Sequence, residues 1–150
     1  VLDNVRSLHN VGSVLRSCDA FRVEAVYLCG ITATPPSAEI HKTALGAEDS
    51  VTWKYFAETT DAVDELHANA TKVLAVEQVA GSTMLQNLQT NGGQRYAVVL
   101  GNEVKGVQQA VVDCCDGCLE IPQFGTKHSL NVSVAAGIVV WEFAKKIGNK

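Results

Sequence analysis

Three short segments of the chain carry side chains that could bind or position a charged substrate, and the first contains Arg16. Apolar residues at helical spacing predict a helix over residues 10–20, with Asn10 as its N-cap and an apolar side formed by Val11, Val14, Leu15 and Cys18. Arg16 lies well away from that side. It therefore either faces solvent, as most arginines do, or faces a cleft where its planar guanidinium binds phosphate. Periodicity does not separate these two interpretations.

The second segment is the loop Gly101-Asn102-Glu103-Val104-Lys105-Gly106, which follows a predicted buried strand and precedes a predicted helix. Ligands bind at this kind of strand-to-helix connection in α/β proteins. The loop is not a P-loop, because Gly106 is followed by Val107 and not by lysine, and it lacks the G-x-G-x-x-G spacing of a dinucleotide site. A simple glycine turn is the alternative interpretation.

The third segment, residues 121–133, leads into the longest predicted helix of the chain. Ser129 is predicted to be the N-cap of that helix. Asn131 would then lie in the first turn of a buried helix, where an amide without partners costs about 1–3 kcal/mol, so we expect it to make specific contacts. Free N–H groups at the helix start could receive an anion. His128 could serve as a general base, but a single loop histidine is more often a surface residue.

The composition is that of an ordinary globular protein. The chain has 150 residues, of which 47% are apolar and 19% charged, and this predicts one domain spanning residues 1–150. The net charge of -4 argues against nucleic-acid binding by overall charge, although it allows a local basic patch. The longest apolar stretch, residues 132–141, is too short to span a membrane, and no signal-peptide pattern is present, so we expect a cytoplasmic protein without a membrane partner.

Five cysteines raise the question of a metal or redox site. Cys115 and Cys118 form a single C-x-x-C motif, whereas a structural zinc site usually needs two such pairs. We therefore expect no metal and mostly reduced, buried thiols. A small-molecule or redox enzyme that uses Cys115 and Cys118 is a rival hypothesis.

Short β-branched runs alternate with helical patterns, which predicts an α/β fold with a mostly parallel sheet flanked by helices. Strands are expected at residues 1–5, 23–29, 51–56, 72–77, 96–100 and 119–121. Helices are expected at residues 10–20, 35–46, 60–70, 107–114 and 129–146, the third of them capped by Thr60. The polar stretch 78–93 has no predicted element. The last helix is apolar or small nearly all round, so it should be buried on most sides.

In order and spacing, the three segments together resemble the SpoU or TrmH-like group of the SPOUT superfamily, whose members are RNA 2′-O-ribose methyltransferases. The matching runs are residues 10–16, 100–106 and 121–133, and the similarity covers essentially the whole chain. The resemblance implies a C-terminal deep trefoil knot, here over about residues 96–150, which would be an exception to the rule that chains are un-knotted. It also implies a homodimer with the active site at the subunit interface.

The resemblance assigns roles to individual residues as well. It implies S-adenosyl-L-methionine as the cofactor and structured RNA as the substrate, with tRNA favoured over rRNA because no added RNA-recognition domain is expected. The residues that match catalytic or substrate-positioning residues of the family are Asn10, Arg16, Glu103, Ser129 and Asn131. Those expected to contact the cofactor are Leu100, Gly101, Ile121 and Leu130, the last three mainly through backbone atoms.

The chemistry implied by the resemblance needs an activated ribose hydroxyl. Such a hydroxyl is a poor nucleophile until its proton is removed or polarised. The resemblance implies that Arg16 assists this step. Because a guanidinium normally stays protonated, we assign Arg16 to the positioning of phosphate and ribose. The alternative is a knotted RNA-binding protein without methyltransferase activity.

Overall fold

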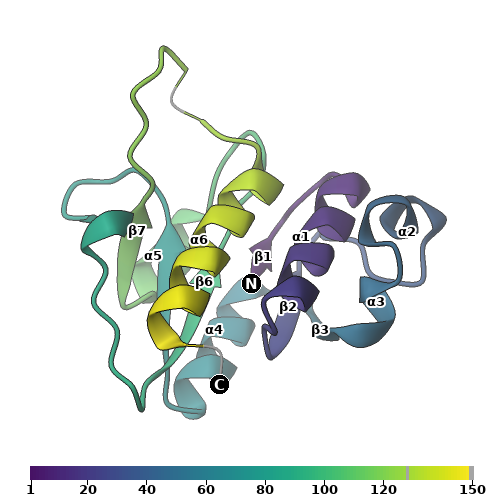
Figure 1. Cartoon of the computed structure of the whole chain (residues 1–150), viewed down its shortest axis with the longest axis horizontal. Helices are drawn as coiled ribbons and strands as arrows, with labels where there is room; N and C mark the ends of the chain where they lie inside the picture. Colours follow the sequence, from purple (N-terminus) through teal and green to yellow (C-terminus); the bar gives the residue numbers. More distant parts are fainter. Residues whose placement is uncertain (128, 149–150) are drawn as a thin grey trace.

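The computed structural model describes residues 1–127 and 129–148, which form alternating strands and helices (Figure 1). The strands are β1 (Leu2–Asp3), β2 (Ala25–Cys29), β3 (Thr52–Phe56), β4 (Thr71–Val76), β5 (Thr83–Met84), β6 (Arg95–Val99) and β7 (Gly117–Glu120). The helices are α1 (Leu8–Ala20), α2 (Ala38–Ala44), α3 (Ala47–Ser50), α4 (Thr59–Ala68), α5 (Gln109–Cys114) and α6 (Val132–Ile147), together with a 3-10 turn at Leu85–Asn87.

Every strand pairing among the described residues is parallel. One sheet has the order β1-β2-β3 and the other the order β5-β7-β4-β6. A bridge between Leu2 and Leu100 joins them, with the N–H of Asp3 donating to the carbonyl of Leu100 (2.8 Å). The two sheets therefore continue into each other, and the predicted α/β fold with a parallel sheet is confirmed.

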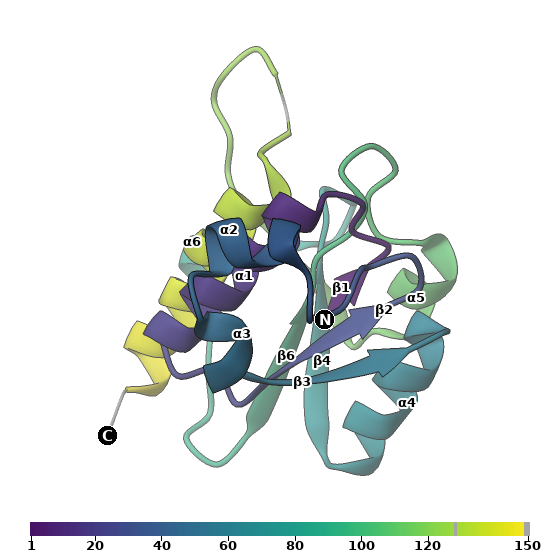
Figure 2. The same cartoon turned by 90° about the vertical axis from the view of Figure 1, so that its right-hand side faces the viewer.

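Helices cover both faces of the sheet (Figure 2). On one face α1 and α6 pack against each other and against β1 and β2, around buried side chains such as Leu2, Leu15 and Leu28. On the other face α4 and α5 pack against β4 and β6, around Val63 and Val99. This two-sided burial explains why strands such as β2 and β4 are short apolar runs in the sequence and not alternating patterns.

Three predicted helix caps were wrong. Helix α1 begins two residues earlier than expected, because the hydroxyl of Ser7, not the side chain of Asn10, is the N-cap acceptor. Helix α6 begins three residues later, with Asn131 and not Ser129 as its N-cap. Helix α4 is preceded by Glu58, so Thr60 lies inside its first turn. In each case two or more polar residues competed for the cap, and the path of the preceding chain decided between them.

The stretch at residues 78–93 contains structure that the sequence did not predict. Strand β5 adds two residues to the edge of the sheet beside β7, and the 3-10 turn follows it. Leu85 and Leu88 are buried there against Leu119 and Phe143. Elements of two and three residues are too short to produce a periodic pattern.

Helix α6 is less buried than its apolar sequence predicted. Val134, Ile138 and Trp141, which share one side of the helix, are 50%, 38% and 51% exposed. The opposite side packs into the core through residues such as Val139. The prediction of burial on most sides was therefore wrong for the single chain, because α1 and the sheet cover only one side of the helix. Among the described residues, none of the helices is long and apolar enough to cross a membrane.

Candidate active site

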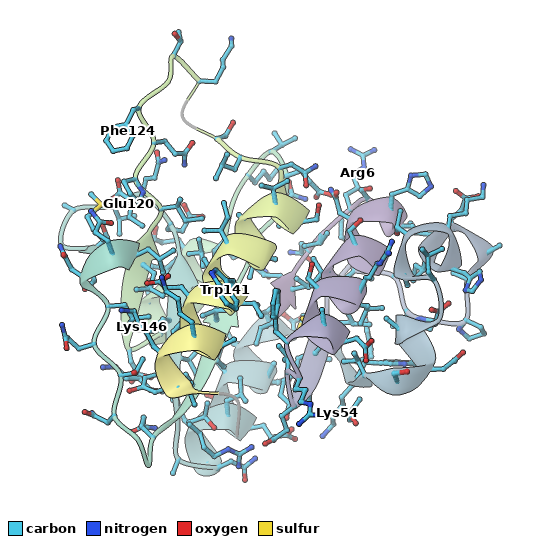
Figure 3. All side chains as sticks on the ribbon, in the orientation of Figure 1. Arg6, Lys54, Glu120, Phe124, Trp141 and Lys146 are labelled. Atoms are coloured by element: carbon cyan, nitrogen blue, oxygen red, sulfur yellow. The ribbon has the colours of Figure 1, made fainter. Side chains whose placement is uncertain are left out.

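The three predicted segments meet at the carboxyl edge of the sheet. The loop at residues 101–106 follows β6, the segment with residues 121–127 and 129–131 follows β7, and α1, which contains residues 10–16, follows β1. Because all of these strands are parallel, their carboxyl ends lie along one edge, and Figure 3 shows Arg6 and Phe124 toward the same end of the molecule. This edge is where open α/β sheets bind ligands.

Glu103 connects the second segment to the first. One carboxylate oxygen, Oε1, accepts from the backbone N–H of Arg6 (2.8 Å). The other, Oε2, accepts from the N–H of Ser7 (2.8 Å) and from Nδ2 of Asn10 (3.0 Å). Ser7 is the N-cap of α1, so the carboxylate lies at the positive end of that helix and neutralises its free N–H groups.

Asn10 continues this network to the third segment. Its Oδ1 accepts from Nδ2 of Asn131 (3.2 Å), and Oδ1 of Asn131 in turn accepts from the backbone N–H of Ser133 (2.9 Å). The amide of Asn131 thus caps α6 and reaches the start of α1 at once. Asn10 thus bonds directly to Glu103, which lies 93 positions away in the sequence, and to Asn131, which lies 121 positions away.

The environment of Glu103 keeps it ionised. Partial burial acts to raise the pKa of the Glu103 carboxyl, but the N–H donors of Arg6, Ser7 and Asn10 together lower it below its ordinary value. An ionised carboxylate whose two oxygens already accept three hydrogen bonds is poorly suited to accept a substrate proton. Glu103 is therefore a group that positions its neighbours.

The loop that carries Glu103 has a fixed shape. A Cβ at Gly101 would lie 2.2 Å from the backbone of Gly106 and Val107, so only glycine allows this close approach. Asn102 stabilises the loop from inside, because its Nδ2 donates to the carbonyl of Asn4 (2.8 Å) and its Oδ1 accepts from the N–H of Val104 (2.9 Å). The interpretation as a simple glycine turn is thus insufficient.

Two carboxylates that the sequence analysis missed hold the far end of this loop. Asp3 is fully buried, and its Oδ2 accepts from the N–H of Gln108 (2.8 Å) while its Oδ1 accepts from Thr59 (2.6 Å). Glu77, which follows β4, accepts from the N–H of Val107 (2.6 Å). A signal existed for Asp3, since an aspartate directly after apolar strand residues is unusual in a buried strand.

The remaining predicted site residues do not take part in the hydrogen-bond network around Glu103. Arg16 is exposed on α1 and forms no hydrogen bond or ion pair with the described residues, so this chain alone does not bring it into the network. Ser129 is exposed and Leu130 is 39% exposed. Ile121 is half-buried against the core, and Leu100 is buried. His128 lies outside the described residues.

The cysteines show no sign of a reactive centre. All five are free, and burial raises the pKa of Cys115 to about 12, which disfavours the reactive thiolate. In the part of the chain that the structure describes, no group of three metal-ligating side chains is arranged around a common point. The rival hypothesis of a redox enzyme based on Cys115 and Cys118 gains no support from this geometry.

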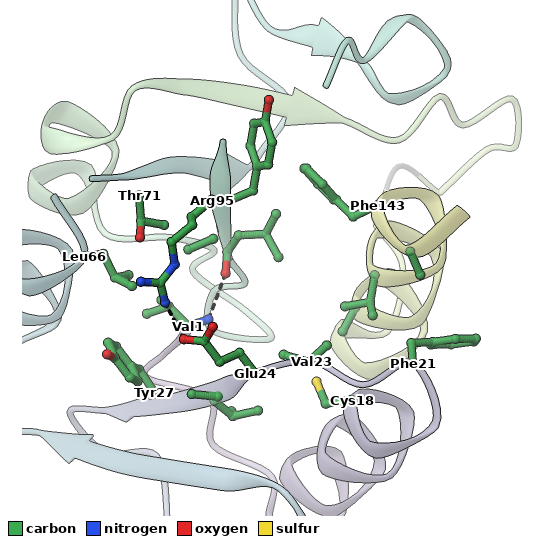
Figure 4. Close-up of a pocket in the computed structure, with 18 of the residues that line it drawn as sticks. Val1, Cys18, Phe21, Val23, Glu24, Tyr27, Leu66, Thr71, Arg95 and Phe143 are labelled. Carbon is green, nitrogen blue, oxygen red and sulfur yellow. Dashed lines mark hydrogen bonds and ion pairs between the residues drawn. The ribbon is translucent and has the colours of Figure 1, made fainter. Parts of the chain in front are cut away.

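A cavity of about 420 Å³ lies at the other end of the strands (Figure 4). Its walls come from β2, β6, α1 and α6, and Figure 4 shows Arg95 and Glu24, which form an ion pair, on one side and Phe143 on the other. Arg95 begins β6, so the cavity borders the amino ends of the strands. It is therefore separate from the network around Glu103.

Comparisons with known proteins agree with this arrangement. The sequence pattern of the SpoU rRNA Methylase family matches residues 1–141. A 23S rRNA (guanosine-2′-O-)-methyltransferase RlmB of Nitrosomonas europaea is 36% identical over 142 residues, which are 95% of this chain and 54% of that protein. The chain spans little more than half the length of the curated relatives it matches.

Two solved structures share the fold over nearly the whole chain. An AdoMet-bound rRNA methyltransferase from Sinorhizobium meliloti superposes with a TM-score of 0.90 and 27% identity, covering 99% of this chain and 56% of that one. The A. aeolicus TrmH/SpoU tRNA modifying enzyme superposes with a TM-score of 0.85 and 26% identity, covering 97% and 72%. The site geometry, the match over residues 1–141 and the shared fold lead to one conclusion: this chain belongs to the SpoU rRNA Methylase family.

Proposed function

We propose that this chain transfers a methyl group from S-adenosyl-L-methionine to a ribose 2′-hydroxyl of structured RNA. The observation that carries the proposal is the direct connection of three distant segments through Glu103, Asn10 and Asn131 at the carboxyl edge of the sheet. The relatives support it, because one is named a guanosine-2′-O-methyltransferase and a structure that superposes closely is AdoMet-bound.

The residues at this edge fit the proposed cofactor. At Gly101 the backbone packs directly against the backbone of Gly106 and Val107, so peptide groups line this edge. The neighbouring loop, residues 121–127 and 129–130, makes no backbone–backbone hydrogen bond within the described part of the chain. Its peptide groups are thus free to bind the polar atoms of a ligand. Leu100, Gly101, Ile121 and Leu130 are the residues we propose to hold the cofactor, which supplies an activated methyl group when it is bound.

The side chains around this surface then position the RNA. Asn10 and Asn131 offer amide groups to the ribose, and Glu103 fixes the orientation of Asn10. We assign Arg16 to binding a phosphate next to the target ribose, because a guanidinium stays charged and matches phosphate geometry. We also assign Ser129, two residues before Asn131, to positioning the substrate. Catalysis in this proposal comes mainly from orientation and from excluding water from the hydroxyl.

The distribution of cations supports an RNA substrate despite the net charge of -4. Five cations are paired with carboxylates: Lys42, Lys54, Arg95, Lys145 and Lys146. Arg6, Lys105 and Lys127, on segments of the site, are exposed and make no ion pair with any described residue, and the same holds for Arg22 and Lys72 elsewhere. The free charges on the site segments give a local electrostatic attraction for phosphates. Relatives are named for rRNA and for tRNA, and we keep tRNA as the favoured substrate class.

We further propose that two chains form a homodimer and that the second chain completes the site. The exposed apolar side of α6 contains Val134, Ile138 and Trp141. Its exposure to water is unfavourable, and exposed apolar patches of this kind often mark protein–protein interfaces. This side of α6 lies beside α1, which carries Arg16, and Trp141 packs against Phe21, the C-cap residue of that helix, with ring centroids 5.5 Å apart. A partner docked there would bring Arg16 close to a second active site.

The proposed knot involves the same part of the chain, about residues 96–150. Strand β7 lies between β4 and β5 in the sheet, so the chain after β7 leaves from within the sheet and not from its edge. We propose that the chain then passes through the loop after β6 before it starts α6. This threading would make a deep trefoil knot with the two proposed cofactor loops side by side.

Calorimetry separates the proposed enzyme from an inactive RNA-binding protein of the same fold. Titration of the chain with S-adenosyl-L-methionine is expected to show saturable binding, and a Gly101→Val variant is expected to lose it because a side chain at residue 101 clashes with the backbone of Val107. Circular dichroism of the variant serves as the folding control. Absence of binding to the unsubstituted protein at millimolar cofactor would contradict the proposal.

A further inference from the structure

The two most exposed large apolar side chains of the described residues are both at the candidate site. Phe124 is 94% exposed and Val104 is 87% exposed, whereas the next, Ile31, is 63% exposed. Phe124 belongs to the loop before Asn131, and Val104 directly follows Glu103. Large apolar surface in water is unfavourable, so its concentration on two loops of one site points to a binding role there.

The sequence segment that contains Phe124 differs from the rest of the chain in its charged residues. No aspartate or glutamate occurs from residue 121 to residue 141. Lys127 is exposed three residues after Phe124, and Lys105 is exposed next to Val104. Each loop thus presents one apolar side chain and one lysine without an ion pair among the described residues. An exposed flat ring with a lysine three residues away, in a segment without carboxylates from residue 121 to residue 141, fits a nucleobase and its phosphate.

The position of Phe124 separates it from the other contacts proposed for this edge. The loop projects from the body of the molecule, and Figure 3 shows Phe124 on this projecting part. The residues proposed for the cofactor lie at its two ends, at Ile121 and Leu130. The apolar surface proposed for a second copy lies along α6, on residues such as Ile138.

We propose that Phe124 is a stacking platform for an unpaired base of the RNA, next to the nucleotide whose ribose is methylated. This inference rests on the proposed function and adds to it a residue that recognises the substrate. An unpaired base is the target because bases in an RNA helix are already stacked, whereas bases in loops offer a free face to aromatic side chains.

The test compares Phe124→Ala with Phe124→Trp, and uses Leu45→Ala as a matched control because Leu45, the C-cap residue of α2, is 57% exposed. Methyl transfer to total RNA is measured over a range of RNA concentrations, and cofactor affinity is measured by calorimetry. Loss of one stacked base is expected to raise the KM for RNA roughly 5- to 150-fold in Phe124→Ala. The cofactor Kd should stay unchanged, and Phe124→Trp and Leu45→Ala should behave like the unsubstituted protein.

Three results would overturn the inference. They are an unchanged KM for RNA in Phe124→Ala, a parallel weakening of cofactor binding, and a change in oligomeric state by analytical ultracentrifugation. If the unsubstituted protein transfers no methyl group, the proposed function fails by itself. The stacking role is then tested by filter binding of labelled total RNA, where Phe124→Ala must bind more weakly than Leu45→Ala for the inference to stand.

Discussion

Replacing Glu103 by glutamine tests whether this carboxylate organises the site. The two oxygens of Glu103 accept from three N–H groups, those of Arg6, Ser7 and Asn10. In Glu103→Gln one oxygen becomes an amide nitrogen, which donates and does not accept. At least one hydrogen bond to a charged acceptor is lost, and two N–H groups then face each other.

The expected size of the effect follows from these contacts. A hydrogen bond to a charged group contributes about 1.5–3 kcal/mol, and the exposure of Glu103 reduces this, so we expect a loss of about 1–2 kcal/mol of unfolding free energy. That loss corresponds to a decrease in Tm of roughly 2–8 °C for a chain of this size. Because Asn10 loses its anchor, kcat for methyl transfer should fall roughly 10- to 100-fold.

The assays are thermal unfolding followed by circular dichroism and methyl transfer at saturating cofactor. Glu58→Gln is the matched control, because Glu58 is an exposed carboxylate at a helix start that forms no side-chain capping bond. It should leave both Tm and kcat nearly unchanged. If Glu103→Gln had the kcat of the unsubstituted protein, the network would not be needed for catalysis and our reasoning about the site would be refuted.

Further predictions concern pH, a phosphate contact, a buried anchor and the proposed interface. Folding lowers the pKa of Glu103, so the stability that its carboxylate contributes is complete above the unfolded pKa of about 4.3 and is lost as pH falls through the lower folded pKa. The Tm difference between the unsubstituted protein and Glu103→Gln should therefore shrink between pH 6 and pH 3. A Tm difference that stays constant over this range would argue against a stabilising role of the Glu103 carboxylate. Arg16→Ala should abolish methyl transfer and leave the calorimetric cofactor Kd nearly intact, whereas a collapse of both would make Arg16 structural. Asp3→Ala leaves the N–H of Gln108 and the hydroxyl of Thr59 without their buried acceptor, so Tm should drop by roughly 6–12 °C, from about 3 kcal/mol; a smaller drop than for Glu103→Gln would contradict this ranking. Trp141→Glu should shift sedimentation toward the mass of one chain, and an unchanged distribution would remove α6 from the proposed interface.

The sequence predicted the fold class well because its signals are local. Strands β2, β3, β4 and β6 each form a short apolar or β-branched run, and their observed bounds differ from the predicted ones by at most two residues. Burial on both faces of a parallel sheet produces such runs directly in β2 and β4, whereas β3 is an edge strand with largely exposed side chains and is rich in aromatic residues. Strand β5 was missed because a two-residue edge strand depends on its partner β7 and not on its own sequence.

The site residues were found from their types, but their contacts were not. Asn131 was expected to need partners, and it has them, yet the partner is Asn10, which lies 121 residues away. The sequence placed the cap of α6 at Ser129 because serine and asparagine are equally good caps. Only the path of the chain before α6 decides which one reaches the free N–H groups.

The apolar character of α6 and the position of Arg16 show a different limit of prediction from the sequence. A helix buried against its own chain and a helix buried against a second copy have the same composition, so the exposure of Trp141 could not be foreseen. Arg16 likewise has no partner among the described residues of a single chain. In the proposed function both features depend on molecules other than this chain, a second copy or RNA.

The most direct test of the central claim is methyl transfer itself. The protein is incubated with S-adenosyl-L-methionine labelled in its methyl group and with total RNA, and the RNA is then digested completely to nucleosides and separated by chromatography. We predict that the label appears in a 2′-O-methylated nucleoside and that it disappears with Arg16→Ala. Label on a base, or no transfer by a protein that binds the cofactor, would contradict the account.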